Sequence, residues 1–154
     1  MNLNKVNNMK DKEAYIDKIL EDVFSLPAPK IKESRKEHIS EFISSAVNGD
    51  TINAYIVIDV QIDNKPGIYI YILTNNKLIQ IGIDINGKIE SLTFILSQIF
   101  KIERKLTDEN RMEIEISFAD NSVGLRYPGD DKNINEFFQK IEQVWVNRGQ
   151  GGAK

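Results

Sequence analysis

Cysteine does not occur among the 154 residues of this chain, and histidine and tryptophan occur once each. Without cysteine the chain has no disulfide, no thiolate metal ligand and no cysteine nucleophile. The net charge of −3 argues against nonspecific nucleic-acid binding, which usually requires a basic surplus. The polar segment 1–13 lacks the apolar core of a signal peptide, and no apolar run approaches the roughly 20 residues of a membrane span. We therefore expect a cytoplasmic protein that binds no nucleic acid.

The spacings that carry catalysis or metal binding are also missing. His38 has no acid or thiol partner nearby in the sequence, so we interpret it as a structural histidine beside the apolar stripe of a helix. Asp59, Asp63 and Asp84 match no metal-binding loop, and we interpret them as solvated strand ends. The sequence predicts no catalytic residue, no cofactor and no metal site.

Two helical segments are predicted at the start of the chain. Residues 1–10 are polar, and we expect them to be disordered. Apolar residues then recur at helical spacing over 11–25 and over 31–47. The prolines of segment 26–29 separate the two patterns, because proline disfavours helix in the residue before it. We predict an N-terminal helical pair over residues 11–48.

From Thr51 the apolar period changes to two, which indicates strands. The predicted strands cover 51–62, 68–74, 77–85, 89–95, 99–106, 112–118 and 123–127. Turn residues separate them, most clearly Asn75-Asn76 and Asn86-Gly87, and segment 63–67 predicts a further tight connection. A helix with a one-sided apolar stripe follows over 133–146, with Asp130 or Asp131 as its cap. We expect residues 148–154 to form a flexible tail.

Three local patterns within residues 52–147 resemble the bacterial pleckstrin-homology-like domains, a group that includes GRAM-like modules. These patterns are the hairpin Tyr71–Ile79, the segment Leu96–Glu103, and the closing hairpin from Met112 to Leu125 with the helix up to Trp145. The resemblance implies a seven-stranded, strongly bent antiparallel barrel, open at one corner and capped by the C-terminal helix. The predicted fold class is α+β, with the helical pair 11–48 preceding a barrel domain over residues 51–147.

The resemblance implies a scaffold that binds lipids, peptides or proteins without catalysis. Phosphoinositide-binding members carry several basic residues around the first hairpin loop, whereas segment 63–67 has one lysine and one aspartate. We therefore expect a non-catalytic binding module that acts through protein–protein contacts. A peripheral lipid- or membrane-associated adaptor is the alternative. A small phage or defence-related inhibitor or immunity factor, and an enzyme that uses the open corner as a pocket, also stay open.

Tyr55, Tyr69 and Tyr71 are the first group of candidate partner-binding residues. We expect all three on the sheet face opposite the isoleucine rows of the first two strands. There they either pack on the helical pair or line an exposed groove for a partner peptide. The helical pair in turn either docks on the barrel or pairs with a second chain, which would give a homodimer.

Lys101, Arg104 and Lys105 are the second group, because they form the densest basic cluster of the chain together with nearby arginines. Glutamates interleave with them, so the group either forms cross-strand ion pairs on a wet sheet face or presents a patch to an acidic partner or a phosphate.

Overall fold

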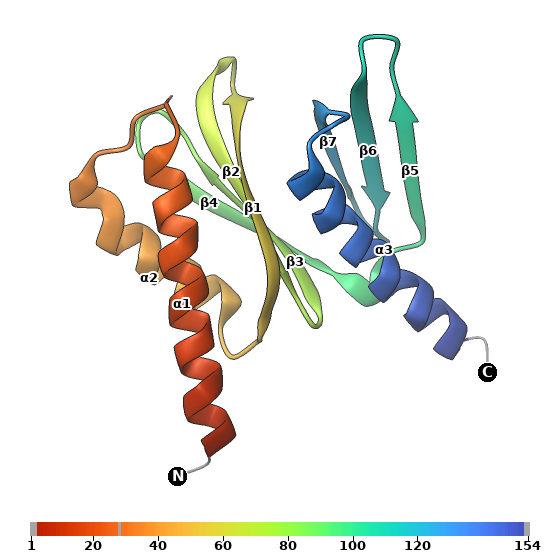
Figure 1. Cartoon of the computed structure of the whole chain (residues 1–154), viewed down its shortest axis with the longest axis horizontal. Coiled ribbons are helices and arrows are strands. Elements are labelled where there is room, and N and C mark those ends of the chain that lie inside the picture. The colour runs from red at the N-terminus through yellow and green to blue at the C-terminus, as the bar shows by residue number, and fades with distance from the viewer. Residues whose placement is uncertain (1–2, 28, 153–154) are drawn as a thin grey trace. The chain divides into compact units, whose positions relative to one another are not determined.

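The computed structural model of the chain describes residues 3–27 and 29–152. It is α+β, as predicted, and its seven described strands are antiparallel. The chain divides into two compact units, Met1–Thr93 and Phe94–Lys154 (Figure 1).

The first unit combines two helices with a four-stranded meander in the order β1-β2-β3-β4. Its elements are α1 (Leu3–Ser25), the 3-10 turn η1 (Glu33–Arg35), α2 (Lys36–Val47), β1 (Ile52–Ile62), β2 (Lys65–Thr74), β3 (Lys77–Ile83) and β4 (Ile89–Ile95). The two-residue turn Asn75-Asn76 lies between β2 and β3, as the sequence predicts. Helix α1 begins at Leu3, so residues 3–10, which we expected to be disordered, are helical; residues 1–2 lie outside the described part.

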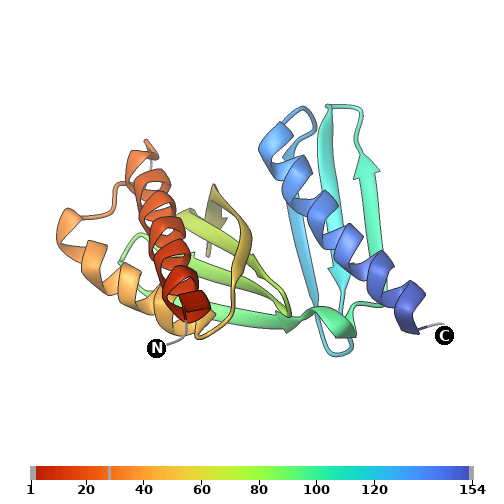
Figure 2. The ribbon, with the colours of Figure 1, turned by 60° about the horizontal axis from the view of Figure 1, so that its bottom comes forward.

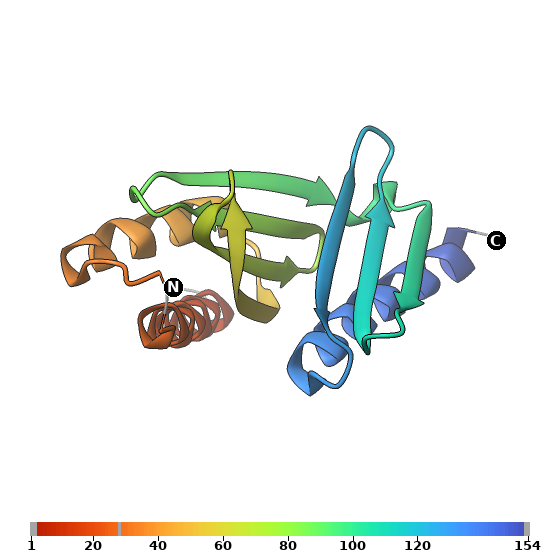
Figure 3. The same ribbon diagram turned by 90° about the horizontal axis from the view of Figure 1, so that it is seen from above.

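Helices α1 and α2 lie side by side on one face of this sheet (Figures 2 and 3). Their apolar stripes and the isoleucines of β2 and β3 form one buried core: Ile16, Ile19, Leu20, Val23, Ile39, Ile43, Val47, Ile68, Ile70, Ile72, Ile79, Ile81 and Ile83. The helical pair therefore docks on the sheet of its own chain. The homodimer through these helices, which we gave as the other possibility, stays a prediction.

A β-bulge at the start of β1 sets which side chains face the helices. Ile52 pairs with Thr74, but Ala54 pairs with Leu73, so the register shifts by one residue. A bulge adds one residue to a single strand and inverts the alternation beyond it. Ile52 therefore lies on the helix face together with Tyr55, whereas Ala54 lies on the opposite face.

A two-residue turn, Asp63-Asn64, joins β1 to β2, with φ values of 53° and 64°. We had predicted that this strand begins at residue 68. Strand β2 in fact begins at Lys65. Pro66 is tolerated in the strand because it pairs only with Gln61 of β1; pairing with β3 starts at Ile68. Proline lacks an N–H, so it fits where no second neighbour needs one.

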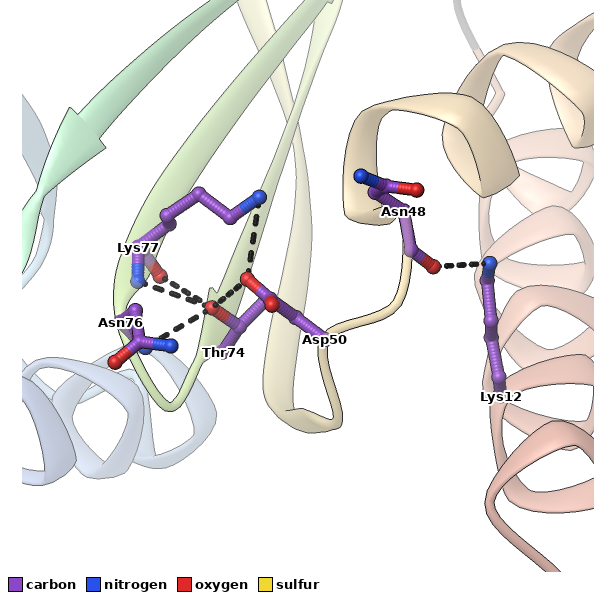
Figure 4. A network of polar contacts seen from close by, with 6 residues as sticks. All are labelled: Lys12, Asn48, Asp50, Thr74, Asn76 and Lys77. Carbon is purple, nitrogen blue, oxygen red and sulfur yellow. Dashed lines mark hydrogen bonds and ion pairs between the residues drawn. The ribbon is translucent and has the colours of Figure 1, made fainter. Parts of the chain in front are cut away.

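A polar network joins the end of α2 to the β2–β3 hairpin (Figure 4). Thr74 is fully buried, and its hydroxyl donates to Asp50 Oδ2 at 3.2 Å and accepts from the Lys77 N–H at 3.0 Å. Lys77 Nζ lies 3.1 Å from the same Asp50 oxygen. On the other side of this connection, Lys12 Nζ of α1 donates to the Asn48 carbonyl at 2.7 Å. These contacts fix the connection between the helices and the sheet.

The second unit is a three-stranded sheet in the order β5-β6-β7 that packs on one long helix. Its elements are the 3-10 turn η2 (Leu96–Gln98), β5 (Lys101–Leu106), β6 (Arg111–Ser117), β7 (Ser122–Pro128) and α3 (Lys132–Gly152). The ring of Phe138 in α3 stacks on Tyr127 of β7, with 5.9 Å between centroids. Asp131, one of the two residues predicted to cap this helix, accepts a hydrogen bond from the Ile134 N–H at 3.1 Å. Helix α3 extends to Gly152, into the segment that we expected to be a flexible tail.

The described strands form two sheets of four and three strands and no closed barrel; the single bent barrel open at one corner that we expected stays a prediction. The number of strands, their order and the final helix agree with the prediction. Closure of a barrel depends on hydrogen bonds between edge strands and on the stagger of the strands. Periodicity within single strands carries no information about either. Among the described residues, no helix combines the length and apolar character needed to cross a membrane.

Candidate functional site

A pocket of about 570 Å³ opens on the first unit, where four elements of the sheet converge. Its lining comes from α2, the four strands β1 to β4, and the β1–β2 and β3–β4 turns: Phe42, Ile62, Asp63, Tyr69, Gln80, Gly82, Asp84, Lys88, Ile89, Glu90, Ser91 and Leu92. Tyr69 pairs with Gly82 and lies on the sheet face opposite the helices. Phe42 of α2 and Ile89 pack against the core on the helix side, so the pocket takes its lining from both sides of the sheet.

Two of the lining residues, Tyr69 and Gly82, are cross-strand partners in close contact. A Cβ atom at Gly82 would lie 3.1 Å from Tyr69 Cε1 and 3.8 Å from Ile62 Cδ1. The tyrosine ring thus extends over the glycine backbone, and the missing side chain leaves room for it. A glycine inside a strand often marks such a close approach. Gly82 within a strand is a sequence signal for this close approach, and our sequence reasoning did not use it.

The rim of the pocket carries more negative than positive charge. Three carboxylates (Asp63, Asp84 and Glu90) and one ammonium group (Lys88) are among the lining residues, a balance of −2. Asp84 Oδ1 accepts from the backbone N–H groups of Asn86 and Lys88, each at 2.9 Å. Lys88 Nζ lies 2.8 Å from Glu90 Oε1, and this hydrogen bond is the main cause of the raised pKa of Lys88.

Strand β4 borders the pocket and is an edge strand of the four-stranded sheet. All side chains from Glu90 to Thr93 are exposed, and Leu92 is 54% exposed. In the turn before the strand, Ile85 is 52% exposed. An apolar side chain at an open strand edge is a feature that proteins usually avoid, because it invites pairing with another strand.

The three candidate tyrosines do not share one face. The register pairs Tyr55 with Ile72, which places Tyr55 on the helix face. There its hydroxyl donates to Asp22 Oδ2 of α1 at 2.7 Å, and its ring meets Tyr15 edge to face with centroids 6.3 Å apart. Burial first, and then the hydrogen bond to Asp22, raises the pKa of Tyr55. Tyr55 therefore fastens α1 to the sheet.

Tyr69 and Tyr71 lie on the opposite face, where their rings meet edge to face with centroids 5.9 Å apart. Tyr71 is fully buried, and its hydroxyl has no hydrogen-bond partner within the described residues. Burial raises the pKa of this phenol. Of the three tyrosines, Tyr69 is the one that lines the pocket.

The basic candidates are divided between the two faces of the β5-β6-β7 sheet. Arg104 pairs with Ile114, which is buried, and its guanidinium lies 2.6 Å from Glu142 of α3. Lys101 forms an ion pair with Glu103 on the other face, and a hydrogen bond from this contact raises the pKa of Lys101. Lys105 lies opposite Glu113 in the register. Lys101 and Arg104 are thus ion-paired within β5 and with α3, not across strands as our first interpretation proposed, and a role of this group in partner binding stays a prediction.

The remaining candidates are dispersed. His38 is exposed on α2. Asp63 and Asp84 both line the pocket, whereas Asp59 lies outside it. Within residues 3–27 and 29–152, no group of three or more His, Cys, Asp or Glu side chains is placed to hold a metal ion. Comparison of the chain with models of known protein families and with curated protein sequences gives no match.

Proposed function

We propose that this chain is a non-catalytic binding module that acts through protein–protein contacts at the pocket beside β4. One observation carries the proposal: a pocket of about 570 Å³, lined in part by Ile62, Tyr69 and Leu92, opens beside an edge strand on which that leucine is exposed. Pockets of this size suit side chains or small ligands. The adjacent unprotected strand edge favours a polypeptide as the ligand.

The polar groups of the rim support binding rather than catalysis. The Asp84 carboxylate already accepts two backbone N–H groups of its own turn, and Glu90 is paired with Lys88. A general acid or base needs a titratable group that is free to exchange a proton with a substrate. These two carboxylates instead stabilise the turn and the strand that frame the pocket.

The order of four strands, three strands and a C-terminal helix supports a distant relationship to the pleckstrin-homology-like domains, which we include in the proposal. Several features speak for a protein partner rather than a lipid. The β1–β2 turn is Asp63-Asn64 and carries no basic residue. Lys101 and Arg104 are each paired with a glutamate. Binding to an anionic membrane needs several unpaired basic groups on one surface.

Affinity capture from cells of the native host, followed by mass spectrometry, tests the proposal with a matched pair of variants. Leu92→Asp places a charge at the pocket, and Leu106→Asp places the same charge at another exposed leucine, which is 58% exposed in β5. We expect the wild type and Leu106→Asp to capture the same partner, and Leu92→Asp to lose it. Circular dichroism checks that both variants are folded.

Two results would overturn the proposal. A partner that Leu92→Asp retains and Leu106→Asp loses would place the contact away from the pocket. Salt-sensitive sedimentation with anionic liposomes, in the absence of any captured protein, would assign the chain to lipid binding.

A further inference from the structure

Resting on the proposed function, we infer that the partner contributes an extended segment that pairs with β4 as a fifth strand of the first sheet. This segment inserts an apolar side chain into the pocket and places a lysine or arginine beside its acidic rim. Addition of a strand to an open sheet edge is a common mode of peptide recognition, in which the backbone supplies affinity and side-chain pockets supply specificity.

The two edges of this sheet differ in how well they are protected. Strand β1 carries a bulge at its start, and Asn53 at the bulge donates a side-chain hydrogen bond to Asn75 at 2.7 Å. Bulges are one of the devices that prevent a strand edge from pairing. Strand β4 has one charged residue, Glu90, and a run of three exposed uncharged residues after it, Ser91 to Thr93. The open edge is therefore β4.

The hydrogen-bond pattern of the β3–β4 hairpin predicts which backbone groups of β4 are available. The Asp84 N–H donates to the Lys88 carbonyl at 3.0 Å. In an antiparallel ladder, residues that bond to the neighbouring strand alternate with residues that point away from it. Counting in steps of two from Lys88, Glu90 and Leu92 bond toward β3. The N–H and carbonyl groups of Ile89, Ser91 and Thr93 are then directed to the open edge.

The charge of the rim identifies the chemistry of the segment. The lining carries three carboxylates against one ammonium group, so an incoming lysine or arginine gains favourable electrostatic interactions there. Asp63 lies at the turn end of the pocket, and Leu92 lies on β4. A segment with an aliphatic residue near Leu92 and a basic residue near Asp63 satisfies both features.

A second copy of this chain is the other candidate for the open edge. Pairing of β4 with β4 of another copy brings two rims of the same negative balance toward each other. Like charges at an interface oppose association. The charge pattern thus favours a different polypeptide over a second copy.

Selection from a random peptide library displayed on phage, with the intact chain as bait, tests this inference. We expect enrichment of peptides that combine an aliphatic residue with lysine or arginine. Ser91→Pro removes one backbone N–H from the open edge, and Ser91→Ala removes the same hydroxyl but keeps the N–H. Ser91→Pro should weaken binding of a selected peptide about tenfold relative to Ser91→Ala, as expected for the loss of about 1.4 kcal/mol.

A second measurement leaves the protein unchanged, in case the proline variant does not fold. Backbone N-methylation of the selected peptide, scanned along its length, should abolish binding at alternate positions, because only every second N–H pairs with β4. Asp63→Asn should weaken peptides that contain lysine or arginine and leave an alanine-substituted peptide unaffected.

The outcomes separate this inference from the proposed function. Selected peptides that tolerate N-methylation throughout, or that bind Ser91→Pro as well as Ser91→Ala, would overturn strand pairing. The proposed function would still stand if Leu92→Asp loses the cellular partner. A concentration-dependent dimer that Ser91→Pro abolishes would assign the edge to a second copy and overturn the inference as well.

Discussion

The hydroxyl of Tyr55 in β1 donates a 2.7 Å hydrogen bond to the carboxylate of Asp22 in α1. These residues are 33 positions apart in the sequence, so their contact joins the first helix to the first strand. A residue proposed from the sequence as part of a partner-binding group thereby has a structural role. Tyr15, which also lies on α1, adds a second contact with Tyr55 through an edge-to-face pair of rings.

Tyr55→Phe should lower the free energy of unfolding by about 1 kcal/mol, because it removes a hydrogen bond to a charged group at a half-buried position. Urea denaturation measures this change. Asp22→Asn should have a related effect, and a double-mutant cycle should show coupling between the two residues. Additive effects of the two substitutions would contradict the role that we assign to this hydrogen bond. Asp17→Asn, an exposed carboxylate on the same helix, is the control.

Alkaline titration should detect three tyrosines that ionise late. Burial raises the pKa of Tyr55, Tyr71 and Tyr127 above the ordinary value of 10.0. As the pH rises, these phenol groups lose their protons in the unfolded chain before they do in the folded chain. Their contribution to the free energy of unfolding is therefore fully present below about pH 10. It is lost as the pH rises toward the folded-state pKa values. Tyrosinate absorbance, followed as the pH is raised, should show a component that titrates above the ordinary tyrosine pKa. Tyr55→Phe should reduce the amplitude of this component, and an unchanged amplitude would refute the raised pKa of Tyr55.

Thr74→Val should destabilise the chain by about 1–3 kcal/mol, because it removes a buried acceptor for the Lys77 N–H and a donor to Asp50. Thr74→Ser keeps the hydroxyl and should recover most of this stability. Thr51→Val, at an exposed threonine just before β1, serves as the control and should change the stability by less than about 0.5 kcal/mol. Equal effects at the two threonines would show that the network of Figure 4 contributes little.

Substitution of alanine for Gly67 and for Gly49 should have very different effects on the free energy of unfolding. A Cβ at Gly67 would lie 2.5 Å from Ile62 Cδ1 and 3.1 Å from the Ile83 carbonyl oxygen, whereas nothing lies within 4 Å of a Cβ at Gly49. Gly67→Ala should therefore cost about 1–3 kcal/mol through overpacking. Gly49→Ala should be neutral or slightly stabilising. Thermal unfolding compares the two variants, and the reverse order would be inconsistent with the close approach at Gly67.

In the second unit, the buried core should contribute far more to the free energy of unfolding than the ion pair between Arg104 and Glu142. Phe138 is fully buried, and Phe138→Ala should cost about 3–5 kcal/mol. Arg104→Ala breaks the pair with Glu142, but the side chains are 36% and 32% exposed, so the cost should stay under about 1 kcal/mol. Fluorescence of Trp145 in α3 follows unfolding of this unit. A larger effect at Arg104 than at Phe138 would contradict this ranking.

Elements with a strong local signal could be predicted from the sequence. The turns at Asn75-Asn76 and Asn86-Gly87 lie where asparagine and glycine predict them, and Gly87 has a φ of 84°. The apolar stripe of α3 and its cap at Asp131 also follow from local rules. The start of β2 was placed three residues late, because Pro66 and Gly67 are turn formers in most contexts and extended here.

The pocket as a whole could not be predicted, since its lining combines Phe42 of α2 with residues 62–92 from four strands and their turns, and no local pattern indicates how these elements pack together. The basic cluster of β5 appeared continuous as a string of residues, but alternation along the strand divides it between two sheet faces. Arg104 then finds Glu142, a partner 38 positions away that no local pattern indicates. Long-range pairing of this kind depends on tertiary packing rather than on local propensity.

The single extra residue at Asn53 resolves a conflict between two anchors of β1. Ile52 and Tyr55 both contribute to the helix side of the sheet, although residues an odd number of positions apart normally point in opposite directions along a strand. Without this bulge, a strand of the same sequence would turn either the isoleucine away from its apolar surroundings or the tyrosine away from its carboxylate, since no regular strand places residues three positions apart on one face.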